Sequence, residues 1–303
     1  MTQPYHIPAL LPQVLEALQM QPDGTYVDAT YGGGGHSRAI LAALGQDGHL
    51  YSFDRDEDAI NQAVSDPRLT MIHGNFRYLA NFLRFYGAGE VDGILADLGV
   101  SFHHFDDAER GFSFRADGPL DMRMNRRSGA TAADVLNTAS VEALTDMFRL
   151  YGEFSEAARL ARAIAKRRET APYATVSELL DTLRGMINPR HEKKELAQVF
   201  QALRIEVNDE MGALRDLLEQ SLTALRPGGR LAIITYHSLE DRLVKNFMRA
   251  GNFAGKVEQD FFGNIQAPMR QLTSKPIVPD EAEIESNPRS RSAKLRVAVK
   301  LPE

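Results

Sequence analysis

The stretch VDATYGGGGHS (residues 27–37) decides the fold, because a β-like run leads into four successive glycines and then into a helix-like segment. Glycines directly after a strand let the backbone approach a ligand closely, and the free N–H groups of the following helix point at that ligand. The helix-like segment HSRAILAALG ends at Gly45, a residue type that commonly follows the last turn of a helix. The stretch therefore predicts a strand, a glycine loop and a helix that together hold a ligand.

Further β-like runs follow at regular spacing. HLYSFD (49–54), LTMIHG (69–74) and VDGILADLG (91–99) place successive strand ends 21 to 26 residues apart. That spacing is typical of strands that alternate with helices in a parallel α/β sheet. The next β-like run, RLAIITYH (230–237), follows an amphipathic helix and an Arg-Pro-Gly-Gly turn (226–229). We expect a mostly parallel, doubly wound sheet of the Rossmann-like class.

A long segment interrupts this pattern. His237 follows Asp97 by 140 residues, where one more strand–helix unit needs only about 30–45. The intervening sequence has helical apolar spacing, and Thr175–Glu178 fits a capping box. We therefore predict a discontinuous domain formed by residues 1–108 and 200–303, interrupted by a helical insert over residues 109–199 that recognises the substrate.

Charge is divided unevenly between these two parts. The 303-residue chain carries 35 Lys and Arg against 41 Asp and Glu, whereas residues 109–199 carry 15 against 13. The insert is thus the basic part of an acidic protein and the part expected to contact a polyanion.

The composition excludes several classes of protein. The chain has no cysteine, which excludes disulfides, thiolate zinc sites, iron–sulfur ligation and a cysteine nucleophile. The N-terminal sequence lacks a signal-peptide pattern, and no apolar run is long enough to span a bilayer. We therefore expect a cytoplasmic protein without a membrane partner.

Acidic and aromatic residues stand where the predicted strands end. Asp54 follows the glycines by about 20 residues, the spacing at which a carboxylate accepts hydrogen bonds from ribose hydroxyls. Phe76 and Asp97 fall at the ends of the next two strands, on the rim where a doubly wound sheet binds its ligand. The set predicts a site for an adenosine-containing cofactor. The alternative is a tight turn flanked by solvated carboxylates.

Two cofactors suit such a site. NAD is weakly supported, because Ser37 stands where the dinucleotide fingerprint has its third glycine. The turn and strand LRPGGRLAII (225–234) after a long helix are typical of methyltransferase sheets. S-adenosylmethionine needs no pyrophosphate cradle, only a close backbone path, an acid for the ribose and a pocket for adenine, where Phe76 could pack.

A set of longer motifs carries a more specific resemblance. VDATYGGGGHS, ILADLGVS, DDAERGFSF, GPLDMRM, FQALRIEVN, YHSLEDR and NPRSRSAKLR occur in this order and cover essentially the whole chain. In these motifs the chain resembles the ribosomal RNA small subunit methyltransferase H family, also called MraW. The resemblance implies methyl transfer from S-adenosylmethionine to the exocyclic N4 of a cytidine in the decoding region of 16S rRNA.

The resemblance also implies which residues bind the cofactor. The matching positions in this sequence are Gly34, Gly35, His36, Asp54, Phe76, Asp97 and His104. The position of His104 departs from the family pattern Ser-Ser-Pro-Gln, because Ser101-Phe-His-His104 stands there. Neutral imidazole, like a glutamine amide, offers one hydrogen-bond donor and one acceptor. We therefore expect His104 to contact the cofactor, in a loop made bulkier by Phe102.

Methylation of an exocyclic amine needs an aligned amine and an acceptor for its proton. Asp97 is one candidate for a catalytic role, although we favour its binding the amino group of the cofactor. His237 is the other candidate and would relay the proton; the alternative is a structural histidine hydrogen-bonded to Glu240 or Asp241. Tyr236 is a stacking candidate for the target base, with core packing as the alternative.

A base in folded RNA must be unstacked before it reaches such a site, so we expect the basic insert to hold the RNA. The candidates for phosphate contacts are Arg123, Arg126, Arg127, Arg159, Arg162 and Lys166. The alternative for each is an ordinary solvated charge. The implied partner is 16S rRNA within a partly assembled small ribosomal subunit, and a homodimer is left open.

We expect no metal site. Methyl transfer requires none, and the sequence neighbours His103, His104, Asp106 and Asp107 are too close along one loop to converge readily on one ion. Two other function classes stay open at this point: an NAD-dependent oxidoreductase on the same sheet, and a non-catalytic ribosome-assembly factor that keeps the cofactor pocket.

Overall fold

The computed structural model describes residues 7–99, 107–263 and 265–302. The chain divides into two compact units, a sheet unit of Met1–Gly99 and Gly212–Glu303 and a helical unit of Val100–Met211. The helical unit extends beyond the expected insert of 109–199 at both ends. At its C-terminal end the reason is α10 (Glu192–Asn208), one continuous helix that residue 199 would cut in half.

These bounds change the charge balance. The helical unit carries 16 Lys and Arg against 18 Asp and Glu. The surplus of basic residues found over 109–199 disappears when the acidic residues at both ends of the unit are included. Both units are therefore acidic, and any affinity of the helical unit for a polyanion depends on where its basic side chains gather.

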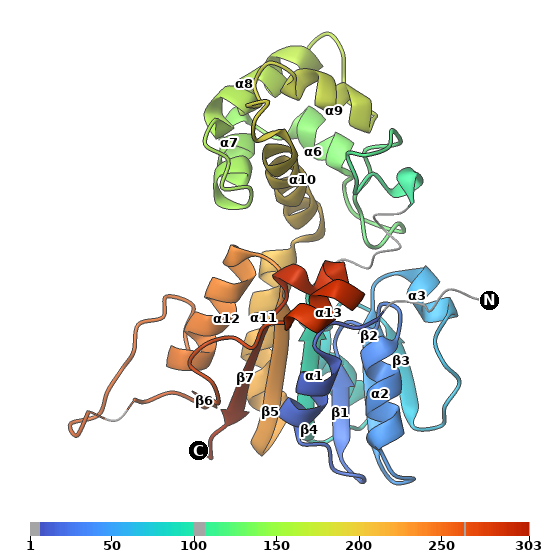
Figure 1. The fold of residues 1–303 in the computed structure, drawn as a ribbon, viewed down its shortest axis with the longest axis vertical. Coiled ribbons are helices and arrows are strands. Elements are labelled where there is room, and N and C mark those ends of the chain that lie inside the picture. Colours follow the sequence, from blue (N-terminus) through green and yellow to red (C-terminus); the bar gives the residue numbers. More distant parts are fainter. Residues whose placement is uncertain (1–6, 100–106, 264, 303) are drawn as a thin grey trace. The chain divides into compact units, whose positions relative to one another are not determined.

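The sheet unit contains one seven-stranded sheet in the order β3-β2-β1-β4-β5-β7-β6 (Figure 1). The first five strands in this order are parallel, and β7 and β6 run antiparallel at one edge. The bounds are β1 Thr25–Asp28, β2 His49–Asp54, β3 Leu69–His73, β4 Val91–Asp97, β5 Leu225–Thr235, β6 Met269–Gln271 and β7 Lys294–Lys300. The prediction of a mostly parallel, doubly wound sheet is confirmed.

The strand order reverses between β1 and β4, which are neighbours although β2 and β3 lie between them in the sequence. Such a switch point leaves a crevice at the carboxyl ends of the strands, where doubly wound sheets bind ligands. Strand β4 is covered on both sides, with Ile94, Leu95 and Ala96 buried. This explains why its sequence reads as a continuous apolar run rather than an alternating one.

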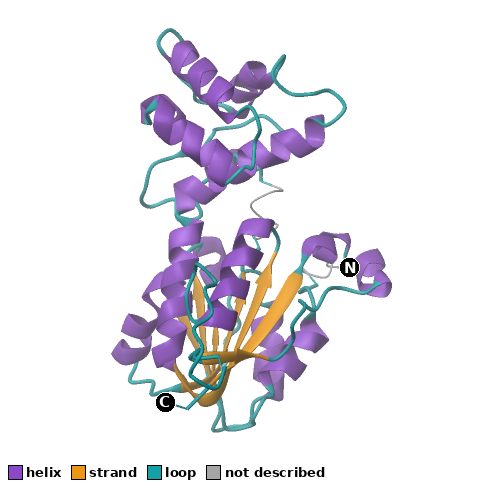
Figure 2. Ribbon diagram, turned by 90° about the vertical axis from the view of Figure 1, so that its left-hand side faces the viewer, coloured by secondary structure: helices purple, strands orange, loops and turns teal. Residues whose placement is uncertain are grey.

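Helices lie on both sides of the sheet (Figure 2). They are α1 Leu11–Leu18, α2 Gly35–Ala43, α3 Glu57–Asn61, α4 Leu79–Phe85, α11 Glu210–Ala224, α12 Ser238–Ala250 and α13 Glu281–Ser286, with 3₁₀ turns at η1 Phe76–Tyr78 and η3 Pro288–Ser292. Leu10, Val14 and Leu18 pack with Ile40 of α2 and Leu95 of β4 in one buried cluster. Among the described residues, no helix combines the length and the apolarity that a bilayer crossing requires.

The helical unit has a core of its own. Its elements are η2 Ala108–Arg110, α6 Ala132–Thr138, α7 Val141–Leu150, α8 Ala157–Arg168, α9 Val176–Leu183 and α10 Glu192–Asn208. Capping boxes begin α6 at Thr131 and α9 at Thr175, the second as the sequence predicts. The buried amide of Asn208 accepts from the Met124 N–H and donates to the Met122 carbonyl, which ties α10 to the chain before α6.

Candidate functional site

The glycine loop joins β1 to α2 in a backbone path that requires glycine. Gly32 and Gly34 have φ values of +52° and +71°, which side chains rarely allow. A Cβ atom on Gly34 would also lie 2.5 Å from the Tyr31 ring. Helix α2 begins at Gly35, and Ser37 in its first turn donates to Asp28 at the end of β1, so the first N–H groups of the helix lie near that strand end.

Asp54 ends β2 beside this loop. Its Oδ2 accepts a hydrogen bond from the Gly32 N–H (2.8 Å), and its Oδ1 accepts one from the Asp56 N–H (2.8 Å). The carboxylate thus fixes the loop while lying at the carboxyl end of the strand next to β1. The structure brings Asp54 to the glycine loop as the sequence predicts, and it adds the bond that holds the two together.

Asp97, at the end of β4, is the polar centre of the rim. Its N–H donates to Thr30 Oγ1 (2.7 Å), which joins β4 to the loop after β1. Its Oδ2 lies 3.8 Å from Nδ1 of the buried His36. Its Oδ1 is buried and accepts no hydrogen bond from the described residues. The rim therefore holds a carboxylate oxygen that has no partner among the described residues and lies beside the first turn of α2.

Tyr236 extends this group from the end of β5. Burial and the neighbouring Asp97 carboxylate raise the pKa of Tyr236 above its ordinary value. A Cβ atom on Gly99 would lie 2.8 Å from the Tyr236 ring, so the ring packs against the chain that follows β4. These contacts support the core-packing alternative for Tyr236 rather than a free stacking face.

Asp28 is a member of the site that the sequence reasoning missed. It ends β1, is fully buried, and accepts from Ser37 Oγ (2.6 Å) and from the Thr30 N–H (3.1 Å). Burial raises the pKa of Asp28 to about 6. A carboxylate and a serine flanking the glycine run, at positions 28 and 37, are the only signal the sequence offers for this link between β1 and α2.

Phe76 stands at the rim after β3. Asn75 caps the turn η1 by accepting the Arg77 N–H (3.1 Å), and the half-buried Phe76 is the first residue of that turn. The Gly74 N–H donates to the Asp54 carbonyl (2.8 Å), so this rim segment adjoins the end of β2. The seventh predicted cofactor residue, His104, lies outside the described residues.

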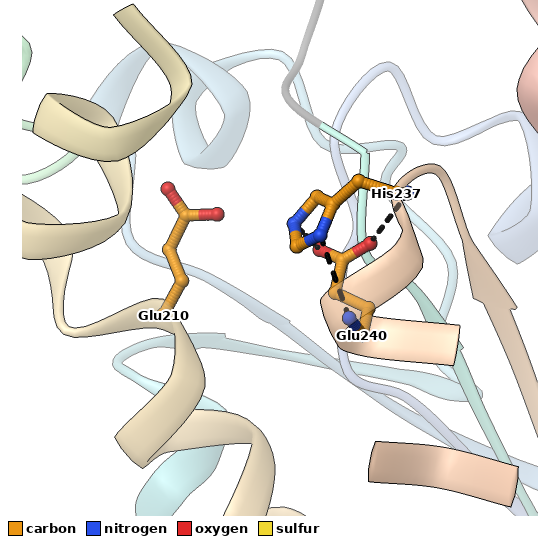
Figure 3. A group of neighbouring side chains, drawn as sticks. All are labelled: Glu210, His237 and Glu240. Carbon is orange, nitrogen blue, oxygen red and sulfur yellow. Dashed lines mark hydrogen bonds and ion pairs between the residues drawn. The ribbon is translucent and has the colours of Figure 1, made fainter. Parts of the chain in front are cut away.

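His237 caps α12. Its Nδ1 accepts the Glu240 N–H at 3.4 Å, and its Nε2 lies 3.1 Å from Glu240 Oε1 (Figure 3). The carboxylate of Glu240 in turn accepts the Tyr236 N–H (2.9 Å). The partner of His237 is therefore Glu240, one of the two expected for a structural histidine. The other, Asp241, pairs with Arg296 at 2.6 Å.

The predicted RNA contacts of the helical unit fall into two groups. Arg159, Arg162 and Lys166 are exposed along one face of α8, while Leu160 and Ile164 are buried on another. The sequence predicts this division of the helix correctly.

In the loop before α6, Arg126 and Arg127 are exposed, but Arg123 is held in place. The Arg123 guanidinium makes two bonds to Asp121 (2.8 and 2.9 Å) and one to the Gly129 carbonyl (3.3 Å). Arg123 therefore has a structural partner that the sequence reasoning did not assign.

Comparison with known proteins identifies the family. The model of the MraW methylase family matches residues 3–301. The chain is 60% identical over 298 residues to ribosomal RNA small subunit methyltransferase H of Parabacteroides distasonis, covering 98% of each protein. It is 60% identical to the Bacteroides fragilis protein of that name and 55% identical to the Porphyromonas gingivalis one, covering 98% of this chain and 97% of each relative. The chain therefore belongs to the MraW methylase family.

Proposed function

We propose that this protein transfers a methyl group from S-adenosylmethionine to the exocyclic N4 of a cytidine in the decoding region of 16S rRNA. The observation that carries the proposal is the buried Oδ1 of Asp97, which has no protein partner among the described residues and lies at the switch point of the sheet. The family membership and the names of the relatives supply the reaction and the RNA substrate.

The residues of the rim suit S-adenosylmethionine. Gly32 and Gly34 form a cradle without side chains, and the carboxylates of Asp54 and Asp97 offer acceptors to a ribose and to an ammonium group. The residues that we assign to cofactor binding are Gly34, Gly35, His36, Asp54, Phe76, Asp97 and His104. When bound, S-adenosylmethionine supplies an electrophilic methyl group on a sulfonium sulfur.

Asp97 and His237 each keep one buried side-chain atom without a hydrogen-bond partner among the described residues, Oδ1 of Asp97 and Nε2 of His237. His237 already accepts the Glu240 N–H and faces the Glu240 carboxylate. Asp97 keeps an acceptor oxygen without a partner in the described part of the chain. We therefore assign Asp97 to the polar contact with the cofactor amino group and retain it as the candidate acceptor for the N4 proton. His237 caps α12 through Nδ1 and is retained as the candidate that relays the proton through Nε2.

The helical unit is the proposed RNA-recognition part. Arg126, Arg127 and the exposed face of α8 present basic groups that suit phosphates. The proposed substrate form is the RNA within a partly assembled small subunit, and the proposed site of action is the cytoplasm.

Methyl transfer and cofactor binding test the proposal together. Purified protein is incubated with labelled S-adenosylmethionine and small subunits, and label in 16S rRNA is measured. The Asp54→Ala variant is expected to bind S-adenosylmethionine about tenfold more weakly, because it loses the ribose acceptor, while its RNA affinity stays unchanged. Asp47→Ala, an exposed acid away from the rim, is the control.

Three results would count against the proposal. No label in the RNA would contradict the enzymatic function. Binding of NAD instead of S-adenosylmethionine would favour an oxidoreductase. Normal subunit assembly supported by an Asp97→Ala protein that cannot methylate would favour an assembly factor.

A further inference from the structure

A short segment near the N-terminus lies against the glycine loop. We call Ile7–Leu10 the strap. A Cβ atom on Gly35 would lie 2.9 Å from the Pro8 ring, so the ring rests on the backbone at the start of α2. The Ala9 carbonyl lies 3.0 Å from Nε2 of His36. The strap therefore contacts two neighbouring residues of the proposed cofactor site.

The C-terminal region holds the strap in this position. Glu283 Oε1 in α13 accepts the Leu10 N–H (2.7 Å), across 273 residues of sequence. Nδ2 of the buried Asn287 donates to the Ile7 carbonyl (3.0 Å). The two ends of the strap are thus fixed by two side chains one helical turn apart, which we call the latch.

The strap needs such a restraint. Leu10 has a φ of +55°, a left-handed conformation that is unfavourable for leucine. It is fully buried, and its N–H precedes α1, where no residue of that helix can accept it. Without the Glu283 carboxylate this buried donor would lose its partner, and the strained backbone would be free to relax.

The strap also selects the tautomer that His36 adopts when its ring is neutral. A carbonyl oxygen only accepts, so the imidazole donates to Ala9 from Nε2, and in the neutral ring Nδ1 is left as an acceptor. That nitrogen faces Asp97 Oδ2 at 3.8 Å, which is itself an acceptor. Two acceptors facing each other leave a position for a donor such as an ammonium group.

We propose that Glu283 and Asn287 are positioning residues for cofactor binding, which latch the strap onto the glycine loop and so hold Nδ1 of His36 beside Asp97. The proposal rests on the proposed function, because the donor it calls for is the amino group of S-adenosylmethionine. Neither latch residue contacts the reacting groups, and each acts through the strap.

Substitutions in the latch test the proposal with two measurements. The first is the Kd for S-adenosylmethionine, and the second is hydrogen exchange of residues 7–18 in the protein without cofactor. Glu283→Ala is expected to raise the Kd about tenfold and to speed exchange in the strap, since the Leu10 N–H loses its acceptor. Asn287→Ala acts at the other end of the strap and is expected to change both readouts in the same direction.

Two matched variants separate the latch from a general loss of charge. Glu283→Gln keeps an oxygen that accepts the Leu10 N–H, so its Kd and exchange are expected to stay close to those of the wild type. Glu285→Ala removes an exposed acid from the same helix and is expected to change neither. Exchange in β4 and β5 reports whether each variant keeps its sheet.

The outcomes distinguish the latch from the function. If the wild type fails to bind S-adenosylmethionine, the proposed function falls and the positioning role falls with it. If the wild type binds, an unchanged Kd in both Glu283→Ala and Asn287→Ala contradicts the latch alone. A Glu283→Gln protein as weak as Glu283→Ala would likewise overturn it, because charge rather than the strap bond would then matter.

Discussion

The rim of the sheet unit and the basic surface of the helical unit satisfy their polar groups in different ways. At the rim, Asp97 keeps a buried oxygen that no described residue bonds. In the helical unit, Arg168 donates to the Leu136 and Ala139 carbonyls, and Arg123 pairs with Asp121, while Arg159, Arg162 and Lys166 of α8 are exposed. The polar atom left over at the rim fits the ligand that we propose for it, whereas the basic side chains of the helical unit divide between internal bonds and exposed positions.

This difference sets how much a single residue matters. A buried polar group with one designated partner costs about 1–3 kcal/mol when that partner is lost. Exposed cations on phosphates act through counterion release, which is additive and depends on salt. We therefore expect large effects of single substitutions at the rim and small, cumulative, salt-dependent effects on α8.

The largest effect is expected from Asp97→Ala. Loss of the central acceptor should lower kcat/KM for methyl transfer by about 100- to 1000-fold, with a raised Kd for S-adenosylmethionine, since we assign Asp97 to the cofactor amino group. Asp47→Ala, which removes an exposed acid, provides the control. Activity near that of the wild type would contradict the expectation that single substitutions at the rim have large effects.

Asp28→Asn should change the pH dependence of stability. Because burial raises the folded-state pKa of Asp28 to about 6, the folded protein holds this proton more tightly than the unfolded chain does. The stability from protonated Asp28 is present below pH 4 and is lost as the pH rises to about 6, a change of about 3 kcal/mol. Urea unfolding at several pH values should show a flatter profile for the variant. An unchanged profile would mean that Asp28 does not titrate in this window.

The smallest effect per residue is expected on α8. Replacing Arg159, Arg162 and Lys166 together by alanine should weaken RNA binding about fivefold and reduce the salt slope by about 2, with cofactor affinity unchanged. Arg168→Ala on the same helix should instead lower the free energy of unfolding by about 1–3 kcal/mol, because two carbonyls lose their donor. A contrary result would be an Arg168→Ala protein of normal stability whose RNA affinity fell more than that of the triple variant. Arg168 would then contact RNA rather than stabilise the helical unit.

Local patterns made much of the sheet and its rim predictable. The strand–glycine–helix stretch and the carboxylates at strand ends depend on spacing alone, and the structure brings Gly34, Asp54 and Asp97 to one rim as expected. The bounds of the helical unit were harder to predict, because α10 continues through the expected boundary at residue 199.

Long-range contacts were not predictable in the same way. The bond of Leu10 to Glu283 joins residues 273 apart, and the contact of Tyr236 with Asp97 joins the ends of two strands separated by the helical unit in sequence. Each pair joins two segments that are distant in the sequence, so no local sequence pattern predicts the contact. The partner of Arg123 is two residues away, yet an exposed basic loop and a paired arginine have the same composition, so the sequence could not separate them.

Mass mapping of modified nucleotides in 16S rRNA, from cells with and without this protein, tests the central claim most directly. The account predicts that one cytidine of the decoding region carries an additional methyl group on N4 when the protein is present, and that this group is absent without it and in cells carrying only the Asp97→Ala protein. Identical methylation of 16S rRNA in all three samples would contradict the account.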